Sequence, residues 1–183
     1  TGPSSLTTLG AAGSTTINGV DWINNGQVNW VSADDFIINN ASFTNQFTGL
    51  SIFNVATTSN LADISGNGSF NNEDVFQVTD LLNAITGDPF ATSSDLNVSV
   101  LFNNISVLSL TNGVITIAHP AFNLIMENNS SYQGLIGVDA GSVITIPSGI
   151  HTFDPNLIFG SDVVLSGGTL SGDLLTTFNV DIT

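Results

Sequence analysis

Short segments in which apolar and polar residues alternate recur along most of the chain, separated by Asn, Gly, Asp, Ser or Thr. Alternation with a period of two predicts half-buried strands, and the β-branched and aromatic residues in these segments favour the same conformation. Residues 16–23 and 27–31 flank an Asn24-Asn25-Gly26 turn, which predicts a β-hairpin. Further strands are expected in residues 36–43, 50–56, 95–102, 104–110, 113–119, 122–126 and 132–138.

The C-terminal part, residues 142–182, is a run of short apolar pairs broken by Gly, Ser, Asp or Pro. Residues 144–149 and 165–172 carry this pattern most clearly, and they are similar to the coils of bacterial haemagglutinin-type and autotransporter-type surface proteins. The resemblance implies a right-handed β-solenoid. No strict repeat period can be counted, and a β-sandwich or jelly roll explains the same spacing. We therefore expect one mainly β domain over residues 1–183, either solenoid-like or a sandwich.

Residues 63–74 have the spacing of a calcium loop. Oxygen-bearing side chains fall at positions 1, 3, 5, 9 and 12, and a glycine at position 6 permits the sharp bend. A Gly/Asn-rich turn between two strands is the alternative interpretation. The expected Ca²⁺ ligands are Asp63, Ser65, Asn67, Asn71, Asp74 and the backbone carbonyl of Ser69.

Apolar residues at helical spacing follow this loop between Val75 and Ile85, and they predict a short amphipathic helix that ends at Thr86–Pro89. The segment 62–86 resembles the dockerin repeat, in which a calcium loop ends in Asp and leads into one helix. Dockerins carry two such repeats and this chain has one, so the resemblance implies calcium ligation without the docking function. Residues 61–87 are expected to be an insertion in the β domain.

The composition and net charge of the chain exclude some classes of partner. The chain has 183 residues, no Lys or Arg, fifteen acidic residues and a formal net charge of −15. Binding to a phosphate backbone depends on Lys and Arg, so nucleic acid is excluded as a partner, and divalent cations are the natural counter-charge. The absence of cysteine excludes disulfides and thiolate metal sites, and no apolar run is long enough to span a membrane.

A chain without basic residues offers no cleavage site to trypsin-like proteases, and we therefore expect it to be extracellular or at a cell surface. Residues 1–15 are small and polar, lack the pattern of a signal peptide, and are expected to form a flexible or docking arm.

No catalytic constellation stands out. His119 and His151 are the only histidines, and neither lies in a motif with a nucleophile, so both are expected to be structural or exposed. Asp34 and Asp35 are adjacent and would point to opposite faces of a strand. We expect no enzyme activity, and a glycoside-active enzyme ranks third among the functions considered.

Two tryptophans offer a binding alternative. Trp22 and Trp30 flank the predicted hairpin and could form a sugar-stacking platform or a packed cross-strand pair. The potential N-glycosylation sites begin at Asn40, Asn67, Asn97, Asn104, Asn128 and Asn129.

The first functional hypothesis is thus an extracellular structural subunit, stabilised by calcium, that assembles with copies of itself into a filament, sheath or surface layer. Strand edges without lysine favour such self-association. The alternative is an adhesin or carbohydrate-binding module whose partners are glycans.

Overall fold

Apart from the last one, successive described strands belong to three sheets in rotation, and every strand pair among the described residues is parallel. The structure is a computed structural model. It describes residues 6–10, 13–31, 34–55, 63–79, 94–106, 113–118, 122–138, 142–154, 158–159, 163–172 and 180–182.

Sheet A is the first face of each coil and contains seven strands. They are β1 (Leu6–Leu9), β4 (Gln27–Trp30), β7 (Ile52–Val55), β10 (Val75–Thr79), β13 (Val114–Ala118), β16 (Leu135–Val138) and β19 (Ile158–Phe159).

Sheet B is the second face and contains eight strands. They are β2 (Thr15–Asn18), β5 (Phe36–Asn39), β8 (Asp63–Ser65), β11 (Ser94–Val98), β14 (Phe122–Met126), β17 (Val143–Ile146), β20 (Val163–Leu165) and β22 (Val180–Ile182).

Sheet C is the third face and again contains seven strands, so the described residues form seven A–B–C coils. Its strands are β3 (Trp22–Asn24), β6 (Ser42–Asn45), β9 (Ser69–Asn72), β12 (Leu101–Asn104), β15 (Ser130–Tyr132), β18 (Ile150–Phe153) and β21 (Thr169–Ser171).

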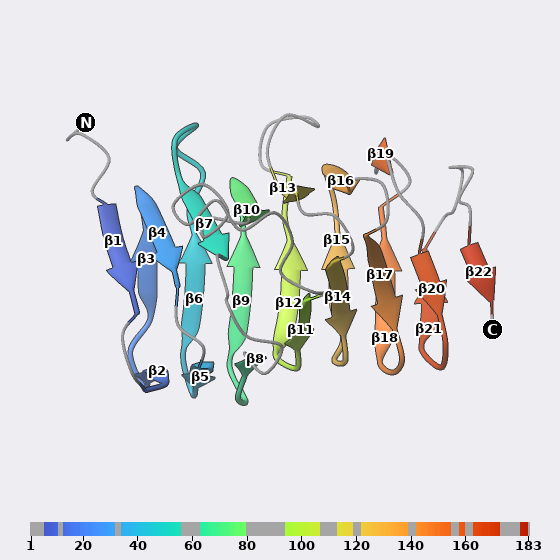
Figure 1. The fold of residues 1–183 in the computed structure, drawn as a ribbon, viewed down its shortest axis with the longest axis horizontal. Coiled ribbons are helices and arrows are strands. Elements are labelled where there is room, and N and C mark those ends of the chain that lie inside the picture. Colours follow the sequence, from blue (N-terminus) through green and yellow to red (C-terminus); the bar gives the residue numbers. More distant parts are fainter. Residues whose placement is uncertain are drawn as a thin grey trace.

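This architecture is a parallel β-solenoid, with the coils stacked side by side along one axis (Figure 1). The β-solenoid expectation is confirmed, and the sandwich alternative is wrong, because a sandwich is built from antiparallel sheets. The predicted hairpin at Asn24–Gly26 is also wrong. Its flanking strands, β3 and β4, lie in sheets C and A and pair with β6 and with β1 and β7.

The predicted helix after residue 74 is wrong for its first turn. Residues 75–79 form β10, which pairs with β7 and β13 in sheet A. The apolar positions Phe76 and Val78 alternate with Val75 and Gln77, so a period of two competes with the helical spacing. The rest of the predicted helix, residues 80–89, lies outside the described residues. Residues 63–79 form β8, β9 and β10 of the solenoid, where an insertion was expected.

The N-terminal segment also contains a strand. Within the predicted arm of residues 1–15, Leu6–Leu9 form β1, paired in register with β4. Residues 1–5 and 11–12 lie outside the described residues. No helix among the described residues is long and apolar enough to cross a membrane.

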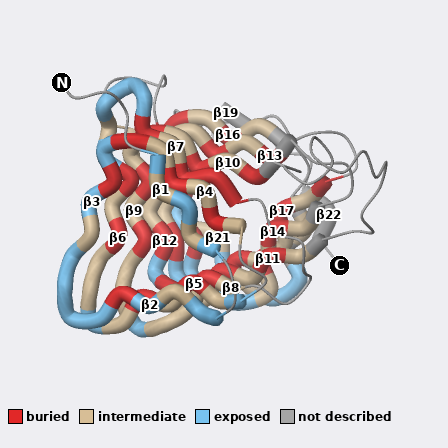
Figure 2. The backbone as a smooth tube through the Cα atoms, turned by 60° about the vertical axis from the view of Figure 1, so that its left-hand side comes forward, coloured by how far each residue is buried: buried red, intermediate tan, exposed pale blue. Residues whose placement is uncertain are grey.

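The core is a continuous column enclosed by the three sheets. Inward positions are buried and outward positions are half-buried or exposed, which is the alternation read from the sequence (Figure 2). Ile64, Phe70 and Phe76 are fully buried and lie on the consecutive strands β8, β9 and β10, one in each sheet. Every described coil contributes to this column, so each buries its apolar face mainly against its neighbours.

Candidate functional site

A column of buried asparagines runs along the corner between sheets C and A. Each is the last residue of its sheet C strand, and parallel register places them directly above one another. The side-chain Nδ2 of each donates to Oδ1 of the next, at 2.8, 2.9 and 2.7 Å. The members of this asparagine ladder are Asn24, Asn45, Asn72 and Asn104.

The same side-chain amides also form hydrogen bonds that connect each corner to the next coil. Nδ2 of Asn24 also donates to the backbone carbonyl of Ile52, Nδ2 of Asn45 to that of Val75, and Nδ2 of Asn72 to that of Val114. Those three carbonyls belong to the first residues of β7, β10 and β13. Buried polar groups are stable only when they are hydrogen-bonded, so the ladder sets the register between coils.

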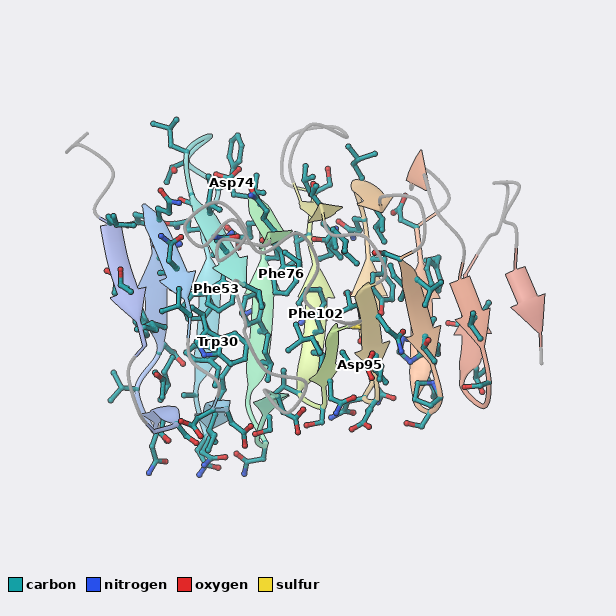
Figure 3. The ribbon with its side chains drawn as sticks, viewed as in Figure 1. Trp30, Phe53, Asp74, Phe76, Asp95 and Phe102 are labelled. Carbon is teal, nitrogen blue, oxygen red and sulfur yellow. The ribbon has the colours of Figure 1, made fainter. Side chains whose placement is uncertain are left out.

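Aromatic rings fill the interior beside this ladder. Phe53 and Phe76 of sheet A are stacked with ring centroids 5.9 Å apart, and Phe70 and Phe102 of sheet C are stacked at 5.3 Å. The labelled rings follow one another along the axis in Figure 3. Offset and edge-to-face contacts of this kind add to the stabilisation from burial of apolar area in this part of the solenoid.

The ladder changes character after Asn104. Tyr132 takes the next place in the column and Phe153 the one after it, with their rings stacked at 4.8 Å. The neighbouring inward position, held by Phe102, passes to Ser130 and then to the fully buried His151. An aromatic column and a polar column thus exchange places at β15.

Hydrogen bonds of the His151 and Tyr132 side chains stabilise the place where the two columns exchange. His151 Nε2 lies 2.7 Å from the carbonyl oxygen of Ser148, which can only accept, so Nε2 carries the proton. Nδ1 is then the acceptor for the Tyr132 hydroxyl at 3.2 Å. Burial lowers the pKa of His151 and raises that of Tyr132, which keeps both side chains neutral. The prediction for His151 was structural or exposed, and its place in the core is structural.

The residues of the predicted calcium loop are spread over one coil. Asp63 and Ser65 are in β8 of sheet B, Asn67 is in the turn that follows, and Ser69 and Asn71 are in β9 of sheet C. The last residue, Asp74, lies beyond β9 at the corner with sheet A. Residues 66–68 form the turn that connects β8 to β9.

The two carboxylates of this set occupy different parts of the coil. Figure 3 places Asp74 at the upper edge of the stack, whereas β8, which begins with Asp63, lies at the lower edge in Figure 1. Oδ2 of Asp74 accepts from the backbone N–H groups of Thr48, Gly49 and Ser51, at 3.2, 3.0 and 2.9 Å. Asp74 thus stabilises the corner loop of the preceding coil.

Asp63 has neighbours of its own. Its backbone N–H donates to Oδ1 of Asp35 at 3.2 Å. Partial burial raises the pKa of Asp63, a hydrogen bond from Asn97 opposes the rise, and the charge of Asp35 adds to it. No group of three or more His, Cys, Asp or Glu in the described part of the chain could hold a metal ion. Calcium binding itself stays a prediction.

The tryptophan platform is wrong. Trp30 is fully buried and packs against Phe36 and Phe53 in the core. Trp22 faces inward from the first coil and meets Phe43 edge-on at 5.5 Å. They belong to different sheets, so they form neither a sugar platform nor a cross-strand pair. His119 lies outside the described residues, and burial of the Asn104 side chain in the ladder leaves no room for a glycan there.

The outer face of sheet C carries a second ladder, here called the outer ladder, most of whose members are half-exposed. Asn71 Nδ2 lies 3.4 Å from Thr44 Oγ1, Asn103 donates to Asn71 Oδ1 at 2.9 Å, and Ser131 donates to Asn103 Oδ1 at 2.9 Å. In the next two coils, Thr152 and Ser171 continue the same column and their hydroxyl oxygens are 3.1 Å apart. The result is a regular, uncharged row of hydroxyl and amide groups.

Sequence reasoning missed both ladders. The available signal was an Asn at the end of a strand, followed within a few residues by the next apolar segment. Successive members of the buried ladder are separated by 21, 27 and 32 residues, so no fixed period exposes them.

Comparison with protein-family models, curated proteins and solved structures finds no match. The functional conclusion therefore depends on the geometry of the chain itself.

Proposed function

We propose that the chain is an extracellular structural subunit that assembles with copies of itself into a filament, sheath or cell-surface layer. One observation carries the proposal: all three sheets extend along a single axis through parallel hydrogen bonds. A further copy can continue each sheet in the same direction with the same bonds, as in cross-β stacking.

The strands at the ends of the described stack support this direction of growth. In the described part of the chain, β1, β2 and β3 each pair on one side only. Unpaired strand edges are templates for association, and natural proteins often protect them with lysine. This chain has no lysine, and Leu6, Val20 and Ile23 of the first coil are exposed.

The interior supports a load-bearing role. The asparagine ladder and the stacked phenylalanines are repeated contacts between neighbouring coils, which is how solenoids acquire stability as their length increases. A solenoid of this kind fits the resemblance to haemagglutinin-type and autotransporter-type surface proteins. An extracellular location suits a chain that has no cleavage site for trypsin-like proteases.

The acidic surface gives divalent cations a role in this proposal. At a net charge of −15, copies repel one another, and Ca²⁺ reduces the repulsion both by screening and by binding carboxylates. Calcium therefore promotes assembly, with no dependence on the six-residue loop.

Glycan binding by an adhesin remains the alternative hypothesis, but its proposed tryptophan pair is lost, since Trp30 is in the core. A glycoside-active enzyme stays the third hypothesis.

Electron microscopy of the purified full chain tests the proposal. We expect ordered polymers at high protein concentration in calcium, and fewer in chelator. A chain that stays monomeric in both buffers, by imaging and by sedimentation, would show that the proposal is wrong, and selective binding on a glycan array would then favour the adhesin.

A further inference from the structure

The charges of the described residues are distributed unevenly around the solenoid. Three described acidic residues, Asp63, Asp95 and Asp181, lie on strands of sheet B. The others lie at the corners between sheets: Asp34 and Asp35 between A and B, Asp21 and Glu127 between B and C, and Glu73, Asp74 and Asp154 between C and A. The outward positions of sheet C, from β6 to β21, carry no charged side chain. In a chain with fifteen acidic residues, this face is one along which two copies can approach with little repulsion.

Exposed apolar side chains gather on the same face. Three of the six exposed large hydrophobic residues in the described part of the chain point outward from sheet C: Ile23, Leu101 and Ile150, at 55%, 41% and 54% exposure. They lie among the Thr, Asn and Ser side chains of the outer ladder. Apolar anchors within an uncharged polar surface are typical of interaction sites.

Sheet A is also uncharged in its outward positions, but it lacks these anchors. Among the sheet A side chains that the structure describes, only Leu6, at the first coil, is an exposed large hydrophobic residue. Apolar exposure therefore favours sheet C over sheet A as the docking face.

We infer that the outer face of sheet C is a docking surface for the same face of a second copy of this chain. A partner with the same strong negative charge is repelled least where the facing side chains are uncharged, as they are at the outward positions of sheet C, between its acidic corners. Asparagine ladders pack well against each other between paired sheets, and a two-fold axis would bring identical patches together.

The size of the face sets the strength of the contact. Seven strands at roughly 4.8 Å spacing make it about 30 Å long, and the two outward columns give it a width of about 10 Å. A footprint of roughly 300 Å² is well below the ~800 Å² per partner of a standard stable interface. Pairing of single chains is therefore weak and reversible.

In a polymer, the same contact would be repeated along the length and would bundle neighbouring filaments by multivalency. This consequence, but not the pairing of single chains, rests on the proposed self-assembly.

The test compares two matched substitutions. Asn71→Asp on sheet C and Asn29→Asp on sheet A each add one negative charge at a half-exposed position. Each keeps an acceptor oxygen for the side chains that donate to it, which are Asn103 in the first case and Gln27 and Asn54 in the second. Circular dichroism and melting confirm that both variants are folded.

Sedimentation equilibrium of the full chain, up to its highest soluble concentration, should show a reversible dimer that salt strengthens. Asn71→Asp should weaken the dimer by about tenfold or more, because a two-fold contact brings the two new charges together. Asn29→Asp should leave it unchanged. As a second pair, Ile150→Thr should weaken the dimer, and Leu50→Thr, at an exposed position outside sheet C, should not.

A wild-type chain that is monomeric at every concentration and salt level would overturn the inference, as would equal effects of Asn71→Asp and Asn29→Asp. Polymers without this dimer would leave the proposed function standing and remove the docking face. A dimer without polymers would support the docking face and show that the proposed function is wrong.

Discussion

Asn71 and Asn72 are adjacent in β9 but face opposite sides of sheet C, and this makes them a matched pair. Asn72 is fully buried and connects Asn45 to Asn104, while Asn71 is half-exposed in the outer ladder. Removing a buried amide leaves partners without hydrogen bonds, whereas water replaces an exposed one.

We therefore expect Asn72→Ala to lower the free energy of unfolding by roughly 2–4 kcal/mol, since two side chains and the Val114 carbonyl lose a partner. Asn71→Ala should cost less than about 1 kcal/mol. Urea unfolding followed by circular dichroism measures both. Similar losses for the two variants would show that the buried ladder has no special part in stability.

Asp63 distinguishes the observed coil from a calcium loop. Its pKa is raised, chiefly by burial, so its charged form is disfavoured in the fold. The folded state therefore holds this proton more tightly than the unfolded state, and stability is lost as pH rises through the folded pKa.

At neutral pH, Asp63→Asn should raise the melting temperature, or leave it unchanged, equally in calcium and in chelator. Asp35→Asn, which removes the neighbouring charge, serves as a comparison and should have the same sign. If Asp63→Asn lowers the melting temperature in calcium only, Asp63 is a calcium ligand and the loop predicted from the sequence forms when the ion is present.

At the scale of elements, the turn between β8 and β9 shows why glycine occurs where it does. Gly66 has φ of +113°, and a Cβ there would collide with the carbonyl oxygen of Ile38 in the preceding coil. Gly68, which the calcium pattern uses for its bend, packs against Ile38 and Ala41 in the same way. Both glycines permit the close approach of stacked turns.

Gly66→Ala should therefore destabilise the fold by on the order of 1–3 kcal/mol through backbone strain and collision. Gly137→Ala is the control, because its Cβ would meet no atom and its φ is not positive. Thermal melting compares them. An unchanged melting temperature in Gly66→Ala would mean that these turns are not tightly stacked.

Strand positions were predictable from the sequence because alternation depends on local residues. Ser69–Asn72 shows the limit: its alternation is visible, but nothing local states that Phe70 pairs in register with Phe43 and Phe102. Parallel partners are separated by a whole coil of variable length, and the same alternation suits a hairpin. The Asn24–Gly26 turn therefore predicted the wrong pairing.

The candidate site was less predictable for a related reason. The spacing of residues 63–74 suits a calcium loop, and the same Asn and Gly residues suit a solenoid turn whose partners lie in other coils. Asn67, for example, accepts from the backbone of Asn40 at 2.8 Å, a contact that depends on stacking. The ladders arise only when coils are in register, so tertiary packing decides which residues act together.

At the scale of the whole molecule, the three sheets make the solenoid a stack of coils that further copies can extend only along its axis. Its core contacts are repeated between coils, and its surface charge is concentrated on sheet B and at the corners. These properties fit a subunit that extends along its axis and associates laterally through sheet C. Both steps depend on weakening the repulsion between copies, which salt and calcium achieve.

Cryo-electron microscopy of the assembled full chain tests the central claim most directly. If subunits join by continuing the parallel sheets, the fibres will show strands perpendicular to the axis and a meridional repeat at about 4.7–4.9 Å that runs unbroken across subunit boundaries. Polymers whose strands run along the axis, or a chain that forms no polymer under any of these conditions, would contradict the account.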